Sequence, residues 1–379
     1  MIAGWARPAR FSPTLFDVRG FWVGSRERAV HSDAMPAAVS VLDLSPIPSG
    51  STAGDALRNT LDLARHAEAL GLRRYWLAEH HNAGSLACSA PEIVIGQIAA
   101  TTRSIRVGSG GIMLPNHSPL RVAEMFRVLH ALFPGRIDLG LGRAPGTDPR
   151  TAAALRRSLE AVSANNFPEQ LAELARYLDD DGPPRPGFSG TIRAIPTNVP
   201  SPELWLLGSG DSGGAVLAAA QGLGFAFAHY MNPDEAPHVL RSYRETFVPT
   251  PRLSKPWAIL AVGVICADSD AKAERLAASS ELAMVWFRQG IRDRPLPSVE
   301  EALAYQYDDV EQALRMGPGG PLLVGGVARV RERIVALIEA TSADEVMVLT
   351  HVHDHEARKR SYELVAAALG LPSAPRTTR

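Results

Sequence analysis

The sequence predicts a single (β/α)8 barrel, a TIM barrel with insertions, on three observations. After residue 38, short apolar runs typical of buried parallel strands alternate with helical patterns eight times. The chain has 379 residues and a hydrophobic share of 46%, enough for a large core in one long barrel domain. Segments rich in glycine or histidine follow the second, third and fourth predicted strands, where barrels of this kind carry their functional loops.

The individual elements follow from apolar periodicity and from their end signals. Strands are expected at residues 39–45, 74–78, 105–109, 137–142, 204–207, 225–229, 257–267 and 345–350. Helices are expected at residues 55–70, 91–102, 120–133, 151–178, 215–221, 234–247, 271–290, 327–340 and 356–369, with a short one at 299–305. Gly71 closes the first helix, and Pro134-Gly135 ends the third. Residues 179–202 form a long excursion, and residues 292–321 are otherwise irregular.

Residues 1–34 differ from the rest of the chain. They carry scattered arginines, show no helix or strand period, and lack the uninterrupted apolar stretch of a secretory signal. Met35 directly precedes the first strand and is a candidate start of translation. We therefore expect residues 1–34 to be a disordered extension or an artefact of gene assignment, and residues 35–379 to form one barrel domain.

Composition excludes several classes of function. A formal net charge of −1 gives no long-range attraction to nucleic acid or to an anionic membrane. No apolar run approaches the length that spans a bilayer. Two cysteines, Cys88 and Cys266, cannot form a disulfide framework or a multi-thiolate metal site. We therefore expect a cytoplasmic protein in a reducing environment, with neither nucleic acid nor membrane as a partner.

Three segments carry the candidate chemistry. Trp76-Leu77-Ala78-Glu79-His80-His81-Asn82 contains the second strand, and Gly108-Ser109-Gly110-Gly111-Ile112-Met113-Leu114-Pro115-Asn116-His117-Ser118-Pro119 contains the third. Gly140-Leu141-Gly142-Arg143 ends the fourth. This pattern indicates a histidine that handles protons near neutral pH beside a slot lined by glycines. Taken alone, an adjacent pair of histidines is also compatible with polar packing.

In order and spacing, these segments resemble the bacterial luciferase-like flavin monooxygenases, over about residues 40–369. The resemblance is closest to the single-chain branch, whose first strand reads like Leu42-Asp43-Leu44-Ser45-Pro46-Ile47-Pro48. It implies that His80 is the catalytic histidine, with His81 beside it, and that both act in proton transfer at the cofactor. It also implies a cis peptide between Gly110 and Gly111 beneath the isoalloxazine ring of FMN.

The resemblance implies further cofactor contacts. Ser45 follows the first strand, and Arg143 would reach the phosphate or ribityl side of FMN as a permanent cation. Asn116 lies beyond the two glycines and would line the rim of the pocket with His117, although both residues also suit the turn before Pro119.

A glycine-rich loop follows the fifth predicted strand. Gly208-Ser209-Gly210-Asp211-Ser212-Gly213 fits the dinucleotide pattern G-x-G-x-x-G between a strand and a helix. The next strand, however, ends in Ala228-His229-Tyr230, without the acidic residue that holds a ribose hydroxyl. We therefore interpret Gly208, Ser209, Gly210, Ser212 and Gly213 as a cradle at a helix N-terminus for the single phosphate of FMN.

Alternating histidines follow the last strand in His351-Val352-His353-Asp354-His355. Alternate residues of an extended segment can point the same way and bind a transition metal. No cysteine or further carboxylate partner is evident in the sequence, and the resembling family uses no metal. A polar segment at the barrel mouth or surface is the favoured interpretation, and no metal site is assigned.

The resemblance implies an FMNH2-dependent two-component monooxygenase. A separate flavin reductase would supply FMNH2, O2 would form a flavin C4a-(hydro)peroxide, and one oxygen atom would pass to a small organic substrate. It also implies a homodimer formed through helices 91–102 and 120–133. Residues 292–321 correspond to the family's variable lid, and the sequence does not identify the substrate. Two alternatives stay open, an F420-dependent hydride-transfer oxidoreductase and a flavin-binding protein without catalysis.

Overall fold

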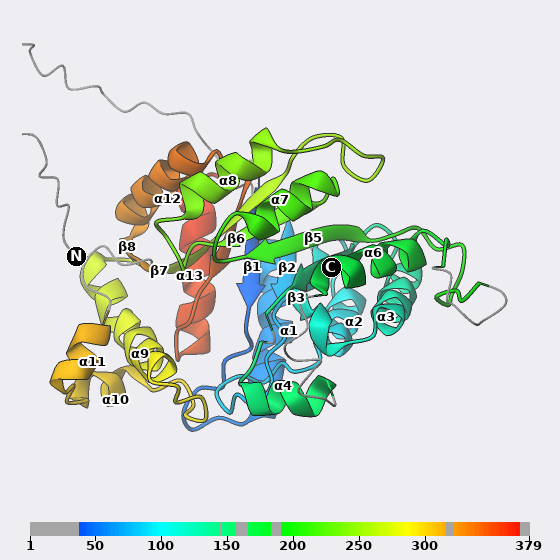
Figure 1. The fold of residues 1–379 in the computed structure, drawn as a ribbon. Helices are drawn as coiled ribbons and strands as arrows, with labels where there is room; N and C mark the ends of the chain where they lie inside the picture. Colours follow the sequence, from blue (N-terminus) through cyan, green and yellow to red (C-terminus); the bar gives the residue numbers. More distant parts are fainter. Residues whose placement is uncertain (1–37, 145, 157–165, 183–190, 316–321, 372–379) are drawn as a thin grey trace, which may run out of the picture. The chain divides into compact units, whose positions relative to one another are not determined.

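The computed structural model describes residues 38–144, 146–156, 166–182, 191–315 and 322–371. Within these residues, eight parallel strands close into a ring and helices cover the outside of the ring (Figure 1), which confirms the predicted (β/α)8 barrel. The ring strands are β1 (Ala38–Asp43), β2 (Arg74–Leu77), β3 (Arg106–Met113), β4 (Ile137–Gly142), β5 (Glu203–Gly208), β6 (Gly224–Ala228), β7 (Ala258–Ala267) and β9 (Glu345–Leu349). The proposed extension, residues 1–34, lies outside the described residues.

The helices follow the strands in alternation. Those between β1 and β5 are α1 (Ala53–Ala69), α2 (Pro91–Thr101), the short 3-10 helix η1 (Leu114–Asn116), α3 (Pro119–Leu132), α4 (Pro149–Arg156) and α6 (Phe167–Leu178). Those after β5 are α7 (Gly213–Ala220), α8 (Ala236–Glu245), α9 (Asp270–Arg288), α10 (Val299–Ala304), α11 (Asp309–Leu314), α12 (Val327–Thr341) and α13 (His355–Ala368). None of the described helices is long and apolar enough to cross a membrane.

The chain between β7 and β9 holds two elements that the sequence analysis did not predict. Helix α11 lies in the segment that was expected to be irregular, and β8 (Leu322–Gly326) precedes α12. Strand β8 pairs with Gly263–Ala267, the second half of β7, whereas Ile259–Gly263 of the same strand pairs with β9 in the ring. Strand β7 therefore belongs to the ring in its first half and to an outer two-stranded extension in its second.

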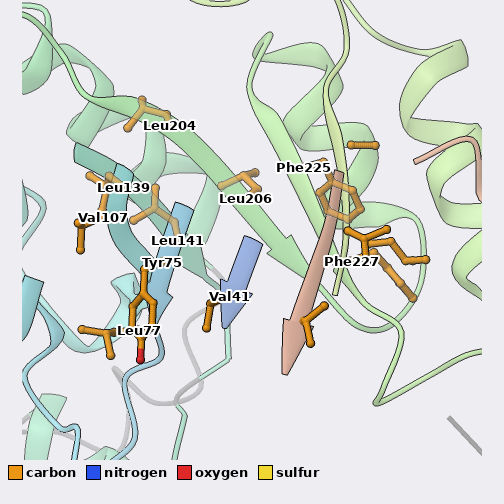
Figure 2. Packing of buried hydrophobic residues seen from close by; sticks show 14 of the residues in the cluster. Val41, Tyr75, Leu77, Val107, Leu139, Leu141, Leu204, Leu206, Phe225 and Phe227 are labelled. Atoms are coloured by element: carbon orange, nitrogen blue, oxygen red, sulfur yellow. The ribbon is translucent and has the colours of Figure 1, made fainter. Parts of the chain in front are cut away.

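The apolar residues form two layers, because successive side chains of a strand point to opposite faces. Val41, Tyr75 and Phe225 belong to the large layer between the ring and the helices (Figure 2), together with buried residues of most helices. Their neighbours in sequence point into the ring. This inner cluster comprises Leu42, Trp76, Ala78, Trp205, Ala226, Ile259, Ala261, Met347 and Leu349. The barrel is therefore a packed core rather than a pore.

A buried charge network fills the amino-terminal end of the barrel. Arg74 at the start of β2 donates from Nε to Glu345 Oε1 at 2.8 Å and from Nη1 to Asp138 Oδ2 at 2.8 Å. Trp76 Nε1 also donates to Asp138 Oδ2, at 2.9 Å. Burial raises the pKa of Asp138, but the Arg74 and Arg106 guanidinium groups outweigh it and lower the pKa overall. A cavity of about 360 Å³ adjoins this network, at the end opposite to the predicted motifs.

Candidate active site

The predicted motifs meet at the carboxyl ends of neighbouring strands. Leu77 of β2 pairs with Ser109 of β3, and Met113 of β3 pairs with Gly142 of β4. Because the strands are parallel, the segments that follow them leave the barrel on one side. The histidine pair follows β2 and the arginine follows β4, so both lie at this side of the barrel. The two glycines, expected after the third strand, lie instead within β3, at the register shift between Ser109 and Ile112.

Glu79 is buried just after the carboxyl end of β2, with only 1% of its surface exposed. Its Oε1 accepts hydrogen bonds from His81 Nε2 at 2.7 Å and from His117 Nε2 at 2.9 Å. Its Oε2 accepts one from the backbone N–H of Met113 at 2.9 Å. Burial alone raises the pKa of Glu79, but these donors, His117 foremost, lower it overall. The carboxylate therefore joins the segments after β2 and β3 in its charged form.

His80 has a different environment from its neighbour and lines a cavity. Its backbone N–H donates to the Cys88 carbonyl at 3.1 Å, which fixes the main chain. Its ring Nδ1 is buried and has no hydrogen-bond partner among the residues that the structure describes. Burial lowers the pKa of His80 to about 4, and the charge of Arg292 acts in the same direction. The imidazole is therefore neutral at pH 7, with a ring nitrogen available to a ligand.

The cavity beside His80 has a volume of about 330 Å³ and a mostly apolar lining. Its inner wall comes from the barrel, through Leu44, Pro46, His80, Tyr230, Gly263, Leu349 and His351. Its outer wall comes mainly from α9 and from the segment that follows this helix. A concave apolar site with a few polar groups at the carboxyl ends of barrel strands is the usual setting of a small-molecule site.

His351 lines the same cavity as His80. Its Nε2 is buried and has no partner within the described part of the chain. Burial lowers the pKa of His351 to about 4, and the charge of Arg358 adds to this effect. Burial also raises the pKa of Tyr230 to about 12. The cavity therefore presents two neutral imidazoles and a protonated phenol in an apolar surrounding.

The three alternating histidines do not converge on one point. His353 Nε2 lies 3.2 Å from the hydroxyl and 3.1 Å from the carbonyl of Ser49. His355 Nε2 donates to Asp62 Oδ2 at 3.0 Å. Among the described residues, the group whose ligand atoms are spaced for a metal ion is Asp62, His355 and Glu356, which includes neither of the other two histidines. The three histidines therefore have separate surroundings, and His355 lies beside Asp62, a carboxylate partner that the sequence analysis did not identify.

The two glycines of β3 are closely packed inside the barrel. The peptide bond between Gly110 and Gly111 is cis, as the resemblance implies. A Cβ atom on Gly110 would lie 2.9 Å from Leu42 Cδ1, and one on Gly111 would lie 2.8 Å from the Gly140 carbonyl oxygen. Both contacts are shorter than carbon and oxygen atoms tolerate. The contact with backbone at Gly111 excludes a side chain there, whereas the end of the Leu42 side chain could shift to admit a small one at Gly110.

The phosphate cradle expected after β5 is a partly exposed loop that leads into α7. Gly208 packs against Phe225, so that a Cβ there would lie 2.8 Å from Phe225 Cζ, whereas a Cβ on Gly210 would meet open space. Asp211 Oδ1 accepts the backbone N–H of Gly213 at 3.1 Å, so that amide already has a partner. Ser209 lies half-buried between them, and Ser212 is the residue immediately before α7.

Arg143 is near this loop because β4 and β5 are neighbours, with Leu141 opposite Leu206. Its side chain is exposed and makes no ion pair with the described residues. Free backbone amides at a helix N-terminus and an unpaired guanidinium are the groups that bind a phosphate. Arg143 and the unoccupied amides of this loop could therefore hold the phosphate of a flavin mononucleotide, although the Gly213 amide is already bound by Asp211. Neither they nor Gly110 and Gly111 line the cavity beside His80.

Two residues that were predicted to contact the cofactor, Ser45 and Asn116, have other partners in the structure. Ser45 has a φ of 50°, its N–H donates to Asp43 Oδ1 at 2.7 Å, and its hydroxyl lies 2.9 Å from Thr60 Oγ1. Asn116 Oδ1 accepts from Arg156 Nε at 3.1 Å. Neither residue is among those that line the 330 Å³ cavity. The structure therefore shows structural partners for both side chains, and their contact with a cofactor stays a prediction.

Sequence analysis missed three features of this site. It gave Glu79 no role, although a carboxylate directly before two histidines was the available signal. It did not place Tyr230 in the cavity, and it did not foresee that arginines after α9 border it. For Tyr230 and the arginines after α9, the local sequence carries no signal, because their positions depend on the closure of the ring.

Comparison with known proteins gives consistent matches over most of the chain. The family model described as luciferase-like monooxygenase matches residues 38–345. A relative named luciferase-like monooxygenase, from Escherichia coli K12, is 45% identical over 332 residues and covers 86% of this chain and 95% of its own. The N-acetyl-S-alkylcysteine monooxygenase of Bacillus subtilis is 35% identical over 332 residues, which are 87% of this chain and 98% of that relative.

Solved structures share the fold. The crystal structure of apo-MsnO8 superposes with a TM-score of 0.81 at 39% identity and covers 90% of this chain and 100% of its own. The oxygenating constituent of a 3,6-diketocamphane monooxygenase from Pseudomonas putida, solved with FMN, has a TM-score of 0.67 at 19% identity, over 91% and 99% of the chains. An F420-dependent secondary alcohol dehydrogenase has a TM-score of 0.59 at 15% identity, over 88% and 99%. The last two likenesses concern the barrel alone.

Proposed function

Because the chain belongs to the luciferase-like monooxygenase family, we propose that it is the oxygenase of an FMNH2-dependent two-component monooxygenase. A separate flavin reductase supplies the reduced cofactor, and one atom of O2 enters a small organic substrate. The observation that carries the proposal is His80, a neutral imidazole that lines an apolar cavity and whose buried Nδ1 has no hydrogen-bond partner among the described residues.

The rim of the barrel supplies the groups that would hold the cofactor. Arg143 and the loop from Gly208 to Gly213 would bind the phosphate, as a fixed cation and as backbone amides at the start of α7. Gly110 and Gly111 would lie beneath the ring. When bound, reduced FMN supplies the two electrons with which O2 is activated, so that the second oxygen atom leaves as water.

His80 would hold or move a proton at its partnerless ring nitrogen. With a pKa of about 4 it is neutral at pH 7, so it can accept a hydrogen bond at one nitrogen and donate from the other. His351 adds a second neutral imidazole to the same cavity. The apolar lining excludes water and thereby disfavours the escape of activated oxygen as hydrogen peroxide.

Glu79 would act as a positioning residue rather than in the reaction. Its carboxylate holds His81 and His117, and the main chain between Glu79 and His81 carries His80. The hydrogen bonds on both sides of His80 therefore fix its direction into the cavity. This arrangement assigns the pair of adjacent histidines two different tasks.

A homodimer is part of the proposal. Ile93 of α2 is 65% exposed, and Val128 and Leu132 of α3 are 46% and 66% exposed. Large apolar side chains on two neighbouring helices are typical of a surface that a second copy covers. The resemblance implies an interface on these same two helices.

Binding and peroxide release test the proposed function. The full chain is mixed anaerobically with photoreduced FMN or with reduced F420, and dissociation constants are measured by fluorescence quenching. We expect FMNH2 to bind at least tenfold more tightly than reduced F420, and bound FMNH2 to release hydrogen peroxide under O2 more slowly than free FMNH2 does. Tight binding of reduced F420 alone would establish the hydride-transfer alternative, and bound FMNH2 that releases peroxide as fast as free FMNH2 would establish a flavin carrier.

A further inference from the structure

The outer wall of the cavity comes from the chain between β7 and β9, not from the ring. Its apolar members are Ala283, Met284, Trp286, Phe287, Ile291, Leu296, Leu314 and Leu322. This wall is fixed to the ring by main-chain bonds. The N–H of Ser85 donates to the Arg292 carbonyl at 3.3 Å, and the N–H of Leu296 donates to the Ile47 carbonyl at 2.8 Å. The segment after α9 is therefore held against the loops that follow β1 and β2.

Three arginines and one carboxylate also line this cavity. The carboxylate, Glu281, is neutralised by Arg315, whose Nη2 lies 2.9 Å away. Arg288 Nη1 donates to the Leu314 carbonyl at 2.6 Å. Arg292 and Arg294 form no ion pair with any residue in the described ranges. Among the charged residues that line the cavity, the arginines therefore outnumber the carboxylates, while Asp293 between Arg292 and Arg294 is exposed outside the lining.

Aromatic rings orient these two arginines. The Arg292 guanidinium lies 4.6 Å from the centre of the Phe287 ring, and that of Arg294 lies 4.9 Å from the centre of the Trp286 ring. Stacking on a ring face fixes the plane of a guanidinium and leaves its N–H groups at the edge available. The charge of Arg292 also reaches His80, since it contributes to the low pKa of that residue. Two oriented cations therefore border an apolar space that contains the candidate catalytic histidine.

We propose that Arg292 and Arg294 bind an anionic group of the substrate, which is an apolar molecule that carries a carboxylate or a similar anion. The proposal rests on the proposed function, in which this cavity holds the substrate. The apolar part would lie against Leu44, Met284 and Leu349, and the anion would face the two guanidinium groups. A planar guanidinium suits a carboxylate because two N–H groups can donate to its two oxygens.

The phosphate of the cofactor is another anion that Arg292 and Arg294 could bind. The order of the strands in the ring, however, separates these arginines from the residues proposed to hold the phosphate. Arg143 and the start of α7 follow β4 and β5, which lie opposite β9 and β1 in the ring. Arg292 contacts the loop after β2, and the cavity is lined by residues that follow β1 and β9 and by Tyr230 and Met231, which follow β6. The two cationic positions therefore belong to different sides of the barrel mouth.

Calorimetry with decanoate and decan-1-ol tests the proposal, because the two probes share a chain and differ in charge. We expect the full chain to bind decanoate more tightly than decan-1-ol at pH 7.5. The double variant Arg292→Gln, Arg294→Gln should lose about 10- to 100-fold in decanoate affinity, the scale of charge-assisted hydrogen bonds, and less than twofold in decan-1-ol affinity. Arg275→Gln is the matched control, since Arg275 is on α9 outside the cavity and pairs with Glu300 at 2.8 Å.

Four results would overturn the proposal. These are no decanoate binding at millimolar concentration, equal affinities of the wild type for both probes, equal losses of both probes in the double variant, and a loss of FMN affinity in that variant without a loss of riboflavin affinity. The last result would assign the arginines to the cofactor phosphate. Near-ultraviolet circular dichroism checks folding, and the Arg292→Lys, Arg294→Lys variant, which keeps both charges, should retain most of the discrimination. A chain that discriminates the probes but binds no FMNH2 would contradict only the proposed function.

Discussion

The carboxylate of Glu79 accepts a hydrogen bond from the imidazole of His117 at 2.9 Å, and the two residues follow adjacent strands of the barrel. The bond has opposite effects on its partners, because it lowers the pKa of Glu79 and raises that of His117. Both shifts favour a charged pair over two neutral groups. The segments after β2 and β3 are therefore joined by a hydrogen bond that strengthens when His117 is protonated.

Glu79→Gln should destabilise the fold by about 1–3 kcal/mol, because the amide keeps one acceptor oxygen but loses the charge that His81 and His117 share and places an NH2 group where Oε2 accepts the Met113 N–H. Urea denaturation at pH 6.5 measures this loss. The pKa of His117, followed by NMR, should fall in the variant. Glu300→Gln, which changes an exposed surface pair, is the control and should alter stability by less than 0.5 kcal/mol. Unchanged stability in Glu79→Gln would show that the network is dispensable.

His80 and His351 should make stability depend on acid pH. Each has a pKa of about 4 in the folded chain and an ordinary pKa of 6.5 when unfolded. Between these values the unfolded chain binds more protons, so their contribution is complete above pH 6.5 and is lost as the pH falls toward 4. The full loss should be about 3 kcal/mol per histidine. The His80→Asn, His351→Asn variant should show a shallower decline between pH 6.5 and 4.5, and equal slopes would contradict the shifts.

Arg143→Ala should weaken FMN binding by about 1–3 kcal/mol through the loss of a charge-assisted contact with the phosphate. Riboflavin, which lacks the phosphate, should bind the variant and the wild type equally. Fluorescence titration measures both ligands, and Arg150→Ala serves as a control at an exposed arginine of α4. If riboflavin affinity falls as much as FMN affinity, Arg143 does not contact the phosphate.

His80→Ala should fold and bind FMNH2 as the wild type does, and should release hydrogen peroxide instead of oxygenated product. Removal of a positioned acid or base typically costs about 10²–10⁴-fold in rate. His81→Ala should have a smaller effect, since His81 is held by Glu79 outside the cavity lining. Peroxide yield per O2 consumed measures the difference. The reverse order of effects would exchange the roles of the two histidines.

Charged substitutions on α2 and α3 should separate the proposed dimer. Ile93→Asp with Leu132→Asp places two charges on exposed apolar positions of these helices. We expect light scattering to give about twice the chain mass of 40.6 kDa for the wild type and the single mass for the variant. Val310→Asp is a matched control, because Val310 is 65% exposed on α11, as Ile93 is on α2. A wild type that is monomeric at micromolar concentration contradicts the proposal.

Sequence patterns predicted the ring of strands because each strand is a short apolar run between turn signals. The same patterns did not reveal β8, whose Leu-Leu-Val-Gly-Gly sequence resembles a loop and whose partner, Gly263–Ala267, is distant in the chain. Pairing between distant segments decides such an edge strand, and local propensity does not report it.

The candidate site could be predicted as a set of segments but not as a set of contacts. The motif around His80 located the rim, yet the different surroundings of His80 and His81 arise only when Glu79 and His117 meet. The orientation of the Ser45 side chain was not predictable either, because it depends on a backbone φ of 50°, which the sequence pattern does not indicate. Arg292 reaches the cavity through the bond between its carbonyl and Ser85, across more than two hundred positions.

The double use of β7 gives the outer wall of the cavity both of its chain connections on one strand. Ring pairing uses Ala258–Ala261 with β6 and Ile259–Gly263 with β9, so the strand pairs that close the ring do not include the described residues of α9, α10 and α11. The stretch that contains these helices, which are grouped at one corner of Figure 1, leaves from β7 and returns to the same strand through β8. If related genes recombined at these two points, the whole segment that forms the outer wall of the cavity would be exchanged as one unit. A duplicated gene could thus acquire a new substrate while the oxygen chemistry of its parent stayed intact.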